Sequence, residues 1–119
     1  MHYDHSEIID QETYKLLKDL MGEEGFEEII SFFCSDTQQA INNLQQAITE
    51  QRAEYVGGIC HKLKSSSKLI GAYNMADLST ELELYIEHRN QARAVKLLKQ
   101  LETEFTMVQK WIEDTAVYS

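Results

Sequence analysis

The chain has 119 residues, which is enough for one small domain and below the size at which a core usually divides. Its hydrophobic content of 43% and charged content of 26% are typical of a globular protein and argue against a disordered chain. Eleven Lys and Arg face twenty Asp and Glu, so the formal net charge is −9. This acidity excludes nucleic acid as an expected partner, because binding to phosphates requires a basic surface.

The chain has no proline and only five glycines, so few residues would break a helix. Two cysteines, the lack of a secretory signal and the lack of a long apolar run together indicate a reducing, cytoplasmic setting without membrane insertion. We therefore expect a cytoplasmic all-helical domain.

Residues 1–9 show no regular period, and we expect a flexible N-terminal arm there, followed by a single domain over residues 10–119. Asp10 is a plausible N-cap for a short first helix, which would end at a turn bracketed by Gly22 and Gly25. Apolar residues then recur at steps of three and four and predict a helix over about 26–50. Phe32 lies off this apolar stripe, so we expect it to contact the first helix.

The apolar period resets near residues 50–52 and predicts a further helix that ends near Gly71. Asn74 and Asn90 are plausible N-caps for two more helices. The inward positions of the helix that follows Asn74 would be Met75, Leu78, Leu82, Tyr85 and Ile86. Four long amphipathic helices with short turns predict an all-α, up-down antiparallel four-helix bundle with a short additional N-terminal helix.

One segment, residues 55–76, differs in charge from the rest of the chain. It contains no carboxylate but carries Lys62, Lys64 and Lys68. A positive region within an acidic protein can attract an acidic partner or hold an anion.

A helical wheel of this segment places His61 on the side facing solvent, away from the apolar stripe. Lys64 lies one turn further along on the same side, while Gly57, Gly58 and Ser65 keep the surroundings of the imidazole small. A neutral imidazole is a nucleophile near neutral pH. If it carried a phosphoryl group, the Lys64 ammonium would compensate the charge, and positioning and charge compensation are most of what phosphoryl transfer needs.

The residues around this histidine form a spaced motif. It consists of His61-Lys62-Leu63-Lys64-Ser65-Ser66-Ser67, then Gly71-Ala72, and then Met75, Ser79 and Leu82-Glu83. This motif resembles the signature of the histidine-containing phosphotransfer (HPt) family, which runs His-x-Leu-Lys-Gly-Ser-Ser, then Gly-Ala, and then a spaced Leu, Cys and Leu-Glu. It departs from the family pattern at Ser65, where Gly is usual, and at Ser79, where Cys is usual.

The resemblance implies a four-helix bundle that exchanges phosphoryl groups with aspartates of receiver domains in a multistep His–Asp phosphorelay. His61 would be the phosphoacceptor and Lys64 the cation that stabilises the phosphoryl group. Glu83 would lie near the acceptor and could orient the imidazole. Lys62 and Lys68 would be docking charges, together with the small residues Gly57, Gly58 and Ser65 around the acceptor.

The expected partners are the receiver domains of a hybrid sensor histidine kinase and of a response regulator, and the chain is expected to act as a monomer. It would need no cofactor or metal of its own, because the receiver supplies the Mg²⁺. No nucleotide-binding loop is found, so we expect a phosphotransfer intermediate rather than a kinase.

Two other functions are compatible with a helical bundle. The first is an adaptor that binds a receiver or kinase domain without exchanging phosphate, and every feature except the motif fits it equally well. The second is a metal-dependent bundle enzyme, which would need inward-facing Glu and His residues. The inward positions are mostly apolar, and we expect Cys34 and Cys60 to be structural, so the second function is disfavoured.

Overall fold

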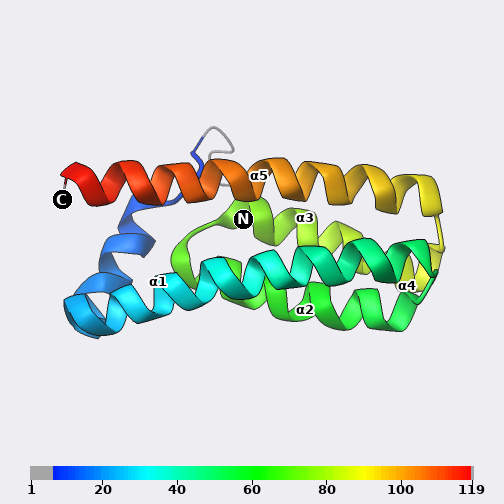
Figure 1. Ribbon diagram of the computed structural model, residues 1–119, viewed down its shortest axis with the longest axis horizontal. Helices are drawn as coiled ribbons and strands as arrows, with labels where there is room; N and C mark the ends of the chain where they lie inside the picture. Colours follow the sequence, from blue (N-terminus) through cyan, green and yellow to red (C-terminus); the bar gives the residue numbers. More distant parts are fainter. Residues whose placement is uncertain (1–6, 119) are drawn as a thin grey trace.

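The computed structural model describes residues 7–118, with side chains described up to residue 116. The described residues form helices and no strands, in the order α1 (Gln11–Thr49), α2 (Ala53–Ile70), α3 (Tyr73–Glu83), α4 (Tyr85–His88) and α5 (Gln91–Tyr118). The long part of α1 runs antiparallel to α2, and α3 and α5 complete the bundle (Figure 1). The predicted all-α bundle is therefore confirmed.

Helix α1 consists of two helical segments that meet at a kink. Gly22 has φ 75° and ψ 163°, a conformation that only glycine adopts without strain. The first segment crosses from the α5 side of the bundle and then reverses into the long segment (Figure 1). The predicted short first helix and the turn at Gly22 are thus confirmed, whereas Gly25 lies inside the second segment rather than in the turn. The Asp10 carboxylate accepts a hydrogen bond from the Thr13 backbone N–H at 3.2 Å, as an N-cap should.

The predictions for the other helix ends are confirmed only in part. Gly71 ends α2 in the left-handed conformation, with φ 89°, and the Asn90 side chain accepts a hydrogen bond from the Arg93 N–H at 3.1 Å at the start of α5. The expected N-cap at Asn74 is wrong, because α3 begins one residue earlier. The Asn74 amide instead donates to the Glu104 carboxylate at 3.3 Å. The helix predicted after residue 74 is also interrupted at Leu84, which divides it into α3 and α4.

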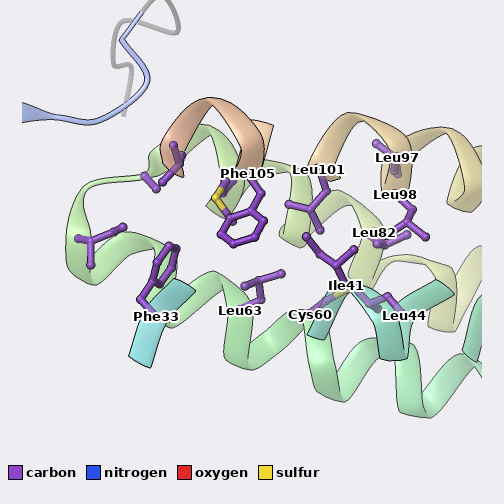
Figure 2. Packing of buried hydrophobic residues seen from close by; sticks show 14 of the residues in the cluster. Phe33, Ile41, Leu44, Cys60, Leu63, Leu82, Leu97, Leu98, Leu101 and Phe105 are labelled. Carbon is purple, nitrogen blue, oxygen red and sulfur yellow. The ribbon is translucent and has the colours of Figure 1, made fainter. Parts of the chain in front are cut away.

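The core forms where the predicted apolar stripes meet. Figure 2 shows side chains from the long helices that point toward one another, among them Phe33, Leu63, Leu82 and Phe105. Rings from distant segments are in contact, with centroids 6.3 Å apart for Phe33 and Phe105. The bundle thus has one continuous core.

The core also includes the chain before α1. Ile9 is 1% exposed, and the Asp10 N–H donates to the Gly71 carbonyl at 2.9 Å. The arm expected over residues 1–9 therefore does not extend to Ile9, because this side chain is packed in the bundle; residues 1–6 lie outside the described residues. The Phe32 side chain is 69% exposed, so any contact with the first helix leaves most of it open to solvent.

Both cysteines are free; Cys60 is buried and Cys34 is half-buried beside the core. None of the described helices combines the length and the apolar character that a membrane crossing requires.

Candidate functional site

Helix α2 has a buried face and an exposed face. The inner face is at most 3% exposed and consists of Val56, Cys60, Leu63, Ser67 and Ile70. On the other side, 66% of the His61 side chain is exposed. The predicted placement of this histidine toward solvent is therefore confirmed, and a rigid helix of the bundle fixes its backbone.

Glu83, the last residue of α3, lies beside the imidazole. Its Oε2 atom is 3.7 Å from Nδ1 of His61, and the carboxylate side chain is only 30% exposed. A carboxylate can accept a hydrogen bond from an N–H group but is repelled by a nitrogen lone pair, so this contact favours the proton on Nδ1. The second ring nitrogen, Nε2, is then left with its lone pair for reaction.

Helix α2 carries three lysines. Neither Lys62, Lys64 nor Lys68 forms an ion pair with any of the residues that the structure describes. Lys64 is half-buried and lies three residues after His61. Long side chains in helices lean toward the helix N-terminus, so the direction expected for Lys64 is toward the turn that carries the histidine. The site therefore combines a nucleophile with uncompensated positive charge.

The two adjacent glycines of α2 face different surroundings. Gly58 is exposed, and a Cβ atom added there would meet nothing within 4 Å. Gly57 is buried, and a Cβ there would lie 2.0 Å from Cδ1 of Ile86. The expectation that Gly57 contributes to the exposed surface around His61 is therefore wrong, because α4 packs over this residue. Ser65 is exposed, and its hydroxyl donates to the His61 carbonyl at 3.5 Å.

A groove of about 370 Å³ runs between α1 and α2. Its lining includes Tyr55, Gly58 and Lys62 from α2, and Asp36 from α1. The Tyr55 side chain is 44% exposed, and the Arg52 guanidinium lies 4.6 Å from its ring centroid. The sequence analysis did not single out Tyr55, although its position one turn before Gly58 could have indicated it.

Cys60 precedes His61 in the chain but has a different chemistry. Burial, and secondarily the negative charge of Glu83, raise the pKa of the Cys60 thiol to about 12. The thiol therefore stays protonated near neutral pH and does not compete with the imidazole as a nucleophile. Among residues 7–116, no three His, Cys, Asp or Glu side chains lie close enough together to hold a metal ion.

The fold of the chain is similar to those of solved structures of known proteins. The chain is similar in fold to histidine-containing phosphotransfer protein B of Pseudomonas aeruginosa, with a TM-score of 0.85 and 22% identity over 93% of this chain and 96% of that one. It is equally similar to a histidine-containing phosphotransfer protein from maize, with a TM-score of 0.85 and 19% identity over 96% and 93% of the two chains. No curated protein sequence matches the chain significantly.

The sequence itself matches the family model of the Hpt domain over residues 28–111. This region contains most of the long segment of α1, all of α2 to α4, and most of α5. It also contains His61, Lys64 and Glu83. Because the match spans well over half of the chain, the chain belongs to the Hpt family of histidine phosphotransfer domains.

Proposed function

We propose that His61 is the phosphoacceptor through which this Hpt domain takes a phosphoryl group from a receiver-domain aspartate and passes it to a response regulator. Membership of the family already gives a histidine phosphotransfer role in a phosphorelay. The observation that carries the assignment to His61 is its position: an imidazole 66% exposed on α2, with a carboxylate at Nδ1. The partners are the receiver domains of a hybrid sensor histidine kinase and of a response regulator.

The geometry suits an attack by Nε2 on phosphorus. The Nε2 lone pair forms the new N–P bond while the P–O bond to the receiver aspartate breaks, and the aspartate leaves as a carboxylate. Nδ1 keeps its proton, so the phosphorylated ring gains a positive charge. The Glu83 carboxylate, 3.7 Å from Nδ1, then stabilises this cationic ring. Return of the group to a second receiver reverses the same step.

The Lys64 ammonium compensates the negative charge of the phosphoryl oxygens. It has no ion-pair partner among the described residues, so its charge is available to the phosphate. Opposite charges about 4 Å apart near a protein surface attract by about 4 kcal/mol before solvation costs. This attraction stabilises both the transition state and phosphohistidine.

Docking uses the surface around the histidine. Gly58 and Ser65 are small, so a partner can approach the helix closely. Lys62 and Lys68 complement the acidic, Mg²⁺-binding pocket of a receiver. The metal belongs to the receiver, so no cofactor is assigned to this chain. The chain has no nucleotide-binding loop, so it acts as a phosphotransfer intermediate rather than as an ATP-dependent kinase, and a single copy is sufficient for this role.

The assignment is tested with His61→Gln and a receiver domain phosphorylated with ³²P. We expect acid-labile labelling of the wild-type chain and none of the variant, because the amide is not a nucleophile. Circular dichroism should show the same helix content for both chains. Undiminished labelling of the variant would overturn the assignment. A wild-type chain that binds the receiver but takes no label would be the adaptor instead.

Lys64→Ala tests the cation separately. We expect transfer from the receiver to slow by roughly tenfold or more, because a charge-assisted contact of about 1.5–3 kcal/mol is lost. The matched control is Lys96→Ala, which removes an exposed lysine from α5. If the transfer rate and the phosphohistidine lifetime are the same in both variants, Lys64 has no part in the mechanism.

A further inference from the structure

Helix α4 packs against α2 at Gly57. Ile86 of α4 is half-buried, and its side chain occupies the volume that a Cβ at position 57 would need. The distances from that Cβ would be 2.0 Å to Cδ1 and 2.6 Å to Cγ1, which are well inside van der Waals contact. A Cβ at position 57 would therefore displace the Ile86 side chain.

Both residues of this contact lie close in the sequence to a residue of the site. Gly57 precedes His61 by one helical turn in α2, and Ile86 follows Glu83 by three residues across the break at Leu84. Fixing Ile86 on Gly57 therefore fixes the end of α3 against the turn that carries the imidazole. The exposed pair of Arg89 and Glu54, 3.3 Å apart, also joins this segment to α2, and exposed pairs contribute little.

We propose that Gly57 and Ile86 form a positioning pair that holds the Glu83 carboxylate at Nδ1 of His61. The pair acts through Glu83 and touches neither the phosphoryl group nor the partner. Its effect is to keep the proton on Nδ1 and the lone pair on Nε2, the nitrogen that attacks in the proposed function. The inference rests on the proposed function only where it concerns the rate of phosphoryl transfer. The tautomer of His61 is a property of the chain alone and is measured without a receiver.

The distance between the two groups explains why such a device is needed. At 3.7 Å, the contact from Glu83 to Nδ1 lies just beyond hydrogen-bond length, and contacts of this kind tighten when the reacting complex forms. A displacement of about 1 Å at a reacting group can lower a rate by roughly a hundredfold. A side chain seated on a glycine leaves little freedom for such a displacement.

The test is Ile86→Ala, followed by ¹⁵N NMR of the His61 ring nitrogens at a pH where the ring is neutral. In the wild-type chain we expect the signature of a protonated Nδ1 and an unprotonated Nε2. In the variant we expect this preference to be lost and transfer from a phosphorylated receiver to slow by ten- to a hundredfold. The matched control is Ile112→Ala, which truncates a partly buried isoleucine at the other end of the bundle.

Two further variants separate positioning from folding. Glu83→Ala removes the carboxylate itself and should reproduce the tautomer change. The double variant Gly57→Ala/Ile86→Ala should recover the Nδ1–H signature, because the new Cβ fills part of the space that the isoleucine leaves. Folding of every variant is checked by thermal unfolding.

The outcomes are distinct. A wild-type tautomer signature in Ile86→Ala, or an equal change in Ile112→Ala, would overturn the inference. Failure of the double variant to recover the signature would also overturn it. If His61→Gln still accepts label, the proposed function fails, yet a tautomer change in Ile86→Ala would still support the positioning pair.

Discussion

On the inner face of α2, Val56, Cys60 and Leu63 are almost completely buried, whereas on the outer face His61 is two-thirds exposed and the lysines lack ionic partners among the described residues. Both faces share one backbone, so the helix that anchors the core also presents the reactive group. Residues that stabilise the core and residues proposed to act in phosphotransfer are therefore direct neighbours in the sequence of α2. Substitutions on the inner face should alter unfolding, and those on the outer face should alter transfer.

The largest expected effect concerns Cys60, which is buried in the core next to the exposed His61. The raised pKa of the Cys60 thiol, about 12 against an ordinary value of 9.0, makes stability depend on pH. Above pH 9 the unfolded chain loses the thiol proton and the native chain keeps it. The stabilisation is therefore complete below pH 9 and falls by about 1.4 kcal/mol per pH unit toward pH 12, or about 4 kcal/mol in all.

This dependence is measured by urea unfolding between pH 8 and pH 11 for the wild type and Cys60→Ala. We expect a smaller alkaline loss in the variant, and the slopes are compared because the substitution also leaves a small cavity. Cys34→Ala serves as a comparison rather than as a control, because burial raises the pKa of this half-buried thiol as well. Equal slopes in the wild type and Cys60→Ala would contradict the prediction.

The two glycines give the next largest contrast. Gly57→Ala should destabilise the fold by about 1–3 kcal/mol, because the new methyl group overlaps Ile86. Gly58→Ala should stabilise it by about 1 kcal/mol, because alanine favours a helix and the added Cβ meets nothing. The measurement is the unfolding free energy of each variant in urea. A loss of stability in Gly58→Ala would show that its surroundings are not open.

Gly58 also provides a test of receiver docking. Gly58→Ala should weaken binding of a receiver by about fivefold, or about 1 kcal/mol, if a partner approaches the helix closely at this position. Isothermal titration calorimetry with an unphosphorylated receiver measures this effect. The variant would then be more stable and less able to bind, and unchanged affinity would remove Gly58 from the docking surface.

The sequence predicted the features that depend on local chemistry. The period of apolar residues indicated the inner face of α2, and Gly71 and Asp10 marked helix ends through conformations and hydrogen bonds that involve only nearby backbone. The exposed position of His61 followed from the same period. These features are set within a few residues along the chain, so a pattern can indicate them.

The features that the sequence missed depend on contacts between distant segments. Gly57 lies at the edge of the apolar stripe, and only the packing of Ile86 decides that it is buried. The break at Leu84, which brings α4 over α2, has no glycine or proline to mark it. Asn74 is a good capping residue by type, but its amide contacts Glu104 of α5 instead.

Two buried serines give the smallest expected contrast. Ser67 and Ser79 are both 0% exposed. The Ser79 hydroxyl donates to the Met75 carbonyl at 2.8 Å, whereas the Ser67 hydroxyl has no hydrogen-bond partner among the residues that the structure describes. A buried polar group without a partner costs about 1–3 kcal/mol. Ser67→Ala should therefore stabilise the fold by about 1 kcal/mol.

Ser79→Ala should be neutral or destabilise the fold by up to about 1 kcal/mol, because it removes a satisfied hydrogen bond. Thermal unfolding of the two variants and the wild type measures the difference, and transfer to the chain should change in neither, since both serines face the core. Equal melting temperatures for the two variants would mean that the Ser67 hydroxyl finds a partner in solution. The inner face of α2 would then carry no unsatisfied polar group, and the contrast between its two faces would be one of exposure and charge alone.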